Sequence, residues 1–99
     1  MTTLGDLAPV LRSKNAGPTL LTLDVLFEDD AGYRRGRAAL TPAVVAARYG
    51  LGAADVTVTP YPPGLAIKIT LPRAVTAGSP GDRDVYGAQQ HRPLLGLPV

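Results

Sequence analysis

The chain has 99 residues, a length typical of one domain, and its apolar content of 45% is enough for a core. It contains no Cys, which excludes disulfides, thiolate metal sites and a Cys nucleophile. The net charge of +2 is far below the basic surface of most nucleic-acid binders, so we expect no nucleic-acid partner. We also see no signal peptide and no apolar run near the ~20 residues that span a bilayer, so we expect a cytoplasmic protein without membrane contact.

The first part of the chain predicts a short helix followed by a loop. Apolar residues recur at helical spacing between Leu4 and Leu11, where Pro9 fits only in a first turn. The next segment, Arg12–Pro18, contains Asn15 and Gly17, two residue types that tolerate positive φ. This composition indicates a loop.

The middle of the chain predicts a strand and then two helices. Apolar side chains alternate along Thr19–Phe27, as they do on the buried face of a strand. Carboxylates follow at the start of Asp30–Ala39, where they suit the positive end of a helix dipole. The segment Thr41–Tyr49 predicts a second helix, because Thr41 is a good N-cap, Pro42 fits the first helical position and Gly50 fits the stop.

A hairpin is predicted next. Two alternating runs, Asp55–Tyr61 and Leu65–Leu71, flank a Pro-Pro-Gly turn, and Pro60 restricts the first run to a sheet edge. Right-handed crossover places Thr19–Phe27 parallel to Asp55–Tyr61, with Leu65–Leu71 antiparallel between them. The predicted class is α+β: a ferredoxin-like half-sandwich with a three-stranded, mainly antiparallel sheet and two or three helices on one face.

The predicted sheet leaves its other face polar but poor in charge. Its side chains are those of Thr22, Asp24, Thr57, Thr59, Tyr61, Lys68 and Thr70. A solvated face usually holds more Lys and Glu, so we expect this face to pack on the C-terminal tail, a second copy or a larger partner. Lys68 and Asp24 are expected to pair across adjacent strands.

Residues 73–99 are rich in Pro and Gly and predict an ordered, irregular tail. We expect one domain over residues 1–99, in which residues 1–72 form the scaffold and residues 73–99 wrap it or a partner. The final apolar residues should dock on the domain. Leu94–Leu97 is expected to add a short edge strand.

Two polar segments, Arg12–Gly17 and Gly81–His91, hold the candidate functional residues. His91 is a candidate general acid or base because imidazole titrates near neutrality, and Asp84 is a candidate to orient it. The candidate residues for binding an anion, carboxylate or amide are Arg12, Ser13, Lys14, Asn15, Arg83, Gln89 and Gln90. The alternative is that these groups only tie the tail to the scaffold.

A triad of Ser13, His91 and an aspartate is conceivable, but no nucleophile elbow surrounds Ser13. Asp82, Asp84 and His91 resemble a metal-ligand set only weakly, because a short Asp-x-Asp pair more often bonds to loop backbone. We therefore expect no metal and no cofactor.

Four motifs resemble a small family of unknown function, whose members are stand-alone chains of about this length. The motifs are Arg12–Pro18, Thr22–Asp24, Ala66–Arg73 and Gly78–His91. More distantly, the chain is similar to the ferredoxin-fold C-terminal domain of the acyclic terpene utilisation AtuA-like proteins. There an Arg-Ser-Gly-Asp-Lys-Gly loop precedes the first strand, as Arg12–Gly17 does here with Lys14-Asn15 in place of Gly-Asp-Lys.

The resemblance implies a small subunit that works beside a larger AtuA-like chain. The first functional hypothesis is therefore a subunit of a heteromeric enzyme that completes a site for a carboxylate or acyl-CoA substrate, such as a hydratase or lyase. The second is an independent structural or binding domain that self-associates through its polar sheet face. A third is a self-sufficient enzyme that uses His91.

Overall fold

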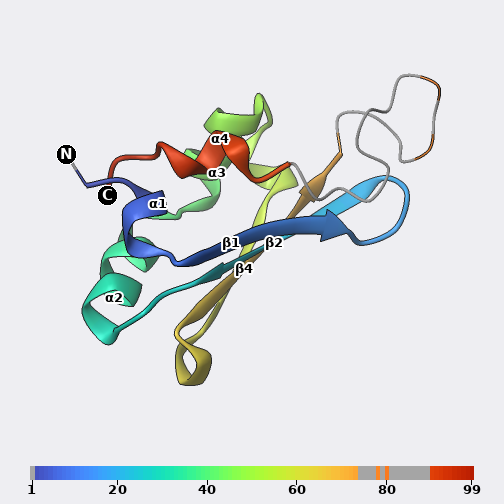
Figure 1. Ribbon diagram of the computed structural model, residues 1–99. Coiled ribbons are helices and arrows are strands. Elements are labelled where there is room, and N and C mark those ends of the chain that lie inside the picture. Colours follow the sequence, from blue (N-terminus) through green and yellow to red (C-terminus); the bar gives the residue numbers. More distant parts are fainter. Residues whose placement is uncertain (1, 74–77, 79, 81–89) are drawn as a thin grey trace.

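A four-stranded sheet with helices on one of its faces forms the protein (Figure 1). The computed structural model describes residues 2–73, 78, 80 and 90–99. The sheet order is β1-β2-β4-β3, and every neighbouring pair is antiparallel. The strands are β1 (Val10–Asn15), β2 (Leu20–Leu26), β3 (Thr57–Tyr61) and β4 (Ala66–Pro72). The described helices are α1 (Leu4–Leu7), α2 (Asp30–Ala39), α3 (Pro42–Tyr49) and α4 (Arg92–Leu95), with 3-10 turns η1 (Ala53–Asp55) and η2 (Pro62–Gly64).

The α+β class is confirmed, but the predicted three-stranded half-sandwich is wrong, because the sheet has a fourth strand. Most of that strand, β1, lies in the segment predicted to be a loop. It forms a hairpin with β2, in which the N–H of Ala16 donates to the carbonyl of Leu20 at 3.0 Å. The predicted helix over Leu4–Leu11 is correspondingly reduced to α1. The other three strands have the predicted order, with β4 between β2 and β3.

The two central helices begin and end at residues that the sequence marks. The carboxylate of Asp29 accepts a 2.7 Å hydrogen bond from the N–H of Gly32 and caps α2. Thr41 caps α3 by accepting from the N–H of Val44 at 3.3 Å, and Gly50 ends the helix in the left-handed conformation at φ 66°. The predictions of both helices are confirmed.

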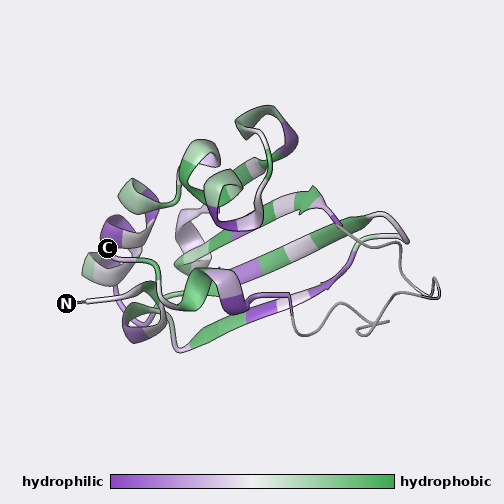
Figure 2. Ribbon diagram, turned by 90° about the horizontal axis from the view of Figure 1, so that it is seen from above, coloured by the Kyte–Doolittle hydropathy of each residue, from purple (hydrophilic) through white to green (hydrophobic). Residues whose placement is uncertain are grey.

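The core lies between the helices and one face of the sheet. The central strands β2 and β4 place alternate apolar residues on that face. In Figure 2 these apolar residues appear as green segments along the strands. The sheet side chains that are almost fully buried are Leu21, Leu23, Val25, Ile67, Ile69 and Leu71. Leu40 and Val45 pack on them from the helical layer. Burying one such side chain stabilises the fold by about 1.5–3 kcal/mol.

The two ends of the described chain meet beside this core (Figure 1). The N–H of Leu4 donates to the carbonyl of Leu97 at 2.8 Å, and Thr3 and Pro98 form an isolated bridge. Leu94 and Leu97 are buried in the core. The edge strand predicted over Leu94–Leu97 is wrong, because Leu94 and Leu95 belong to α4 and neither Gly96 nor Leu97 lies in a strand.

Candidate functional site

Strand β1 divides the predicted binding residues between the two faces of the sheet. Because successive side chains of a strand point to opposite faces, Arg12 and Lys14 share one face, and Ser13 and Asn15 share the other. Ser13 is buried against the helical side, whereas Arg12 and Lys14 are exposed. The four residues predicted to line one loop therefore do not gather into a single cradle.

The outer face, away from the helices, is named the open face. The strand register aligns its side chains in rows that cross all four strands. One row is apolar and consists of Val10, Leu26, Ala66 and Tyr61. The next row holds an acidic and two basic side chains and consists of Arg12, Asp24, Lys68 and Thr59. The third row is polar and consists of Lys14, Thr22, Thr70 and Thr57.

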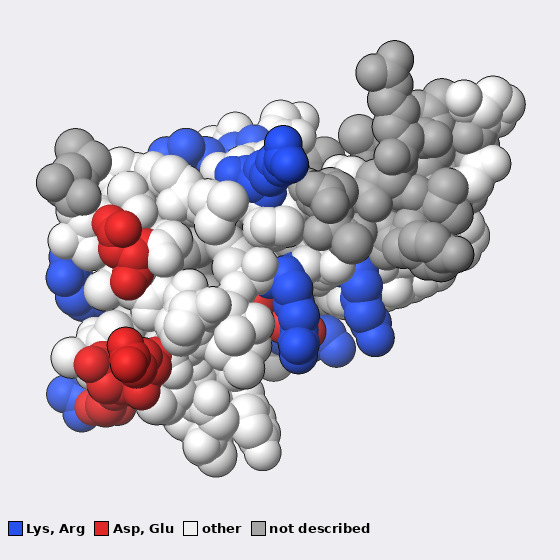
Figure 3. Space-filling view, in the orientation of Figure 1, with Lys and Arg blue, Asp and Glu red and all other residues white. Residues whose placement is uncertain are grey.

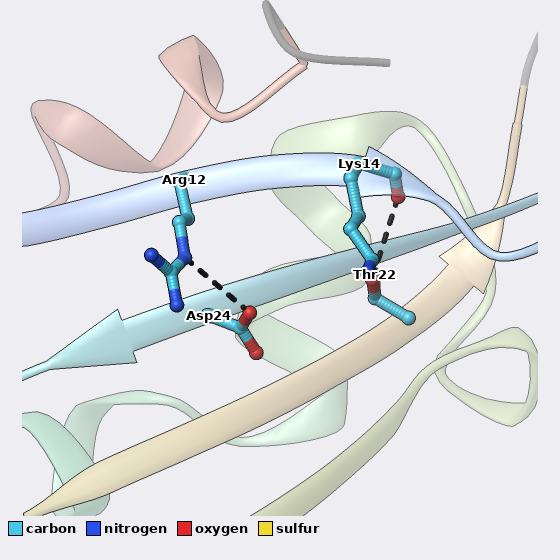
Figure 4. A network of polar contacts seen from close by, with 4 residues as sticks. All are labelled: Arg12, Lys14, Thr22 and Asp24. Carbon is cyan, nitrogen blue, oxygen red and sulfur yellow. Dashed lines mark hydrogen bonds and ion pairs between the residues drawn. The ribbon is translucent and has the colours of Figure 1, made fainter. Parts of the chain in front are cut away.

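An ion pair links β1 to β2 on the open face. The Nε of Arg12 lies 3.6 Å from Oδ2 of Asp24 (Figure 4), and the Arg12 side chain is 67% exposed. Lys68 stands opposite Asp24 on β4, but the carboxylate pairs with Arg12 instead of the lysine predicted for it. Beside this pair, the Thr22 hydroxyl donates to the carbonyl of Lys14 at 3.4 Å.

On the helical side, side chains from β1 and α3 hold the main chain of Gln90. The Ser13 hydroxyl accepts a 2.9 Å hydrogen bond from the N–H of Gln90, and the Tyr49 hydroxyl donates to its carbonyl at 2.7 Å. Burial raises the pKa of the Tyr49 phenol well above its ordinary value of 10.0, so this group stays a donor at neutral pH.

A third contact joins β1 to the end of β4 near this point. The guanidinium of Arg73 donates to Oδ1 of Asn15 at 3.1 Å. We name Ser13, Asn15, Tyr49, Arg73 and Gln90 the clasp. Sequence reasoning missed two of them, Tyr49 and Arg73, as site residues. The sequence pointed to Arg73, because it is the last residue of one of the motifs that carry the family resemblance. For Tyr49 the sequence indicated only a core-facing position on a helix.

His91 follows the clasp directly and precedes the first turn of α4. Its Nδ1 is buried and has no hydrogen-bond partner among the residues that the structure describes. Buried polar atoms are usually hydrogen-bonded, so an unpaired ring nitrogen calls for an explanation. Nδ1 of His91 is thus one of two buried side-chain polar atoms in the described ranges that have no hydrogen-bond partner; the other is the hydroxyl oxygen of Tyr33.

Several predicted site residues lie outside the described residues, namely Asp82, Arg83, Asp84 and Gln89. The orientation of His91 by Asp84 and the anion contacts of Arg83 and Gln89 therefore stay predictions. Within residues 2–73, 78, 80 and 90–99, no three acidic or histidine side chains gather in a way that could hold a metal ion. None of the helices in those ranges has the length and apolar character needed to cross a membrane.

Comparison with known families gives one match. The model of a domain of unknown function, DUF4387, matches residues 4–98. The chain belongs to this family. Neither the curated proteins nor the solved structures include a significant match. The predicted membership of a small family of unknown function is therefore confirmed.

Proposed function

We propose that this DUF4387 protein is the small subunit of a heteromeric enzyme and completes a site for a carboxylate or acyl-CoA substrate. The observation that carries the proposal is the unpaired, buried Nδ1 of His91 next to the clasp. His91 as a residue is only half-buried, so a substrate or a second chain can approach it, although Nδ1 itself is covered. The main-chain N–H and carbonyl of the neighbouring Gln90 are both hydrogen-bonded, which fixes the backbone position from which the His91 side chain extends.

The described side chains near His91 are suited to binding and not to a complete reaction. The hydroxyl of Ser13 is engaged by the N–H of Gln90, which supports a structural role for it and not that of a nucleophile. The amide of Asn15 and the guanidinium of Arg73 provide polar groups of the kind that bind carboxylates. In this proposal a second chain supplies the remaining reactive groups.

The proposed larger subunit is an AtuA-like protein. The support is the sequence resemblance of Arg12–Gly17 to the Arg-Ser-Gly-Asp-Lys-Gly segment of the AtuA-like C-terminal domain, although Arg12–Asn15 here lie in strand β1 and not in a loop before the first strand. In this proposal His91 removes the proton α to the carboxylate or thioester during an elimination, while a group of the larger chain protonates the β-hydroxyl, which leaves as water; hydration is the reverse.

Co-purification tests this proposal. The tagged chain, produced at native levels in its own cells, is expected to recover a larger chain in a fixed ratio, and the pair should turn over a hydroxyacyl or enoyl substrate. A His91→Ala variant should keep the larger chain and lose at least about 100-fold in turnover, the usual size of a general acid–base contribution. Arg48→Ala, on the exposed side of α3, is the control and should change neither. A chain that stays alone at native levels would refute the proposal.

A further inference from the structure

Several side chains of the open face are strongly exposed, whereas Thr22 is buried and others near the middle of the sheet are half-buried. Tyr61 is 61% exposed, Leu20 42% and Val10 37%, and all three lie on this face. The helices lie on the other side of the sheet (Figure 1). Aromatic side chains are enriched where proteins meet, and Tyr61 ends an apolar row that crosses the whole sheet.

The charges of this face are unbalanced. Its rows hold three cations, Arg12, Lys14 and Lys68, against the single carboxylate of Asp24, which Arg12 already pairs. Neither lysine forms an ion pair with a described residue. In Figure 3 basic side chains lie below β1 and also over the helical layer, whereas the acidic ones lie mainly toward the end of the molecule that holds α1 and α2. A surface with this excess attracts carboxylates and repels other cations.

We propose that the open face docks on a different protein chain, whose surface presents carboxylates opposite Lys14 and Lys68 and apolar side chains opposite the row that ends at Tyr61. The inference rests on the proposed function and names the surface through which the larger subunit is bound. The small hydroxyl side chains between these groups, such as Thr57 and Thr59, leave the sheet flat enough for close approach.

The charge pattern disfavours a second copy as the occupant. A two-fold contact of the open face with itself would bring the cations of both copies together, and juxtaposed like charges are costly. The acidic residues Glu28, Asp29 and Asp30 lie at the start of α2, outside the open face. If these acidic residues bound the open face of another copy, two different surfaces would be joined. Such contacts add copy after copy into an open chain, unless the rotation between copies closes a ring.

The experiment uses two variants and a matched control. Lys14→Glu/Lys68→Gln reverses the excess positive charge without placing a glutamate opposite Asp24, where it would weaken the sheet. Arg37→Glu/Arg48→Gln makes the same charge change on exposed residues of α2 and α3. Tyr61→Ala shortens the apolar row. All mutated residues are exposed, so we expect thermal unfolding close to that of the wild type.

The chain recovered with the tagged wild-type protein is purified and titrated against each variant at low and high salt. We expect Lys14→Glu/Lys68→Gln to weaken binding by about 30-fold or more and Tyr61→Ala by about tenfold, and the control pair to bind like the wild type. The wild-type affinity should fall as salt rises.

Equal binding by the wild type and the open-face variants would overturn this inference while leaving the heteromeric enzyme in place. If the wild type recovers no chain, both proposals fail. Sedimentation of the purified wild type adds a further test, for which we expect a monomer. A dimer that Tyr61→Ala dissociates would assign the open face to a second copy and refute the inference.

Discussion

The hydroxyl of Ser13 accepts a 2.9 Å hydrogen bond from the main-chain N–H of Gln90, 77 residues later in the sequence. This contact joins the edge strand β1 to the segment that leads into α4. Ser13 is itself buried, so water does not readily replace the hydroxyl if it is removed. The pair therefore fixes the position of His91, the next residue, relative to the sheet.

A Ser13→Ala substitution should destabilise the fold by about 1–3 kcal/mol, because it leaves a part-buried N–H without its acceptor. Urea unfolding followed by circular dichroism measures the change. Thr57→Ala, an exposed hydroxyl on the opposite face, is the control and should stay within about 0.5 kcal/mol of the wild type. A Ser13→Ala stability equal to that of the control would show that the contact is dispensable.

Tyr49→Phe should cost about 1 kcal/mol at neutral pH, since it removes the donor to the Gln90 carbonyl. It should also alter the response to alkali. Burial favours the neutral phenol, so the folded chain holds this proton more tightly than the unfolded chain. The resulting stability is complete below the ordinary pKa of 10.0 and declines as pH rises above it.

Urea midpoints at about pH 8 and about pH 10.5 test this second effect. The wild type should lose more stability between the two values than Tyr49→Phe does. Tyr61→Phe is the matched control, because it removes an exposed phenol in place of a buried one. If the wild type and Tyr49→Phe lose the same stability between the two pH values, the raised pKa of Tyr49 does not contribute to the stability of the fold.

Gly36→Ala should destabilise the protein although it lies within α2, where alanine normally gains about 1 kcal/mol over glycine. A Cβ at this position would overlap the ring of Phe27, which is buried and packs edge-on against Tyr33 with ring centroids 6.0 Å apart. Overpacking of this kind costs about 1–3 kcal/mol.

Thermal unfolding measures the change. In a Phe27→Leu background, Gly36→Ala should cost less stability than it costs in the wild type, because the ring that the new Cβ overlaps is gone. A Gly36→Ala protein more stable than the wild type would mean that the ring moves aside at little cost.

Arg12→Ala should change the stability by less than about 1 kcal/mol, because the ion pair with Asp24 is largely exposed. Asp24→Asn should behave similarly, and both effects should shrink as salt rises. Urea unfolding at two salt concentrations provides the measurement. A loss above about 2 kcal/mol would give the pair a structural role that exposed ion pairs rarely have.

Local sequence signals were sufficient for α2 and α3 and for three of the strands. Thr41, Pro42 and Gly50 act on the backbone within a few residues, so α3 follows from the sequence alone. The alternation in β2 and β4 is equally local, and crossover rules then place the predicted strands in the observed order.

Strand β1 and helix α4 depend on contacts that are distant in sequence. The polar residues Ser13 and Asn15 take the inward positions of β1, where apolar side chains normally reveal a strand, because their partners are Gln90 and Arg73. The edge of β2 then provides the hydrogen bonds that convert this segment from a loop into a strand. The apolar run at Leu94–Leu97 was too short for its period to separate helix from strand.

The sequence by itself therefore determined the α+β class, the boundaries of α2 and α3 and the order of β2, β4 and β3. The tertiary structure alone decided which face each residue of Arg12–Asn15 occupies. The reason is geometric: a loop can gather consecutive polar side chains, whereas a strand sends them alternately to opposite faces. That alternation separates the clasp beside His91 from the basic open face.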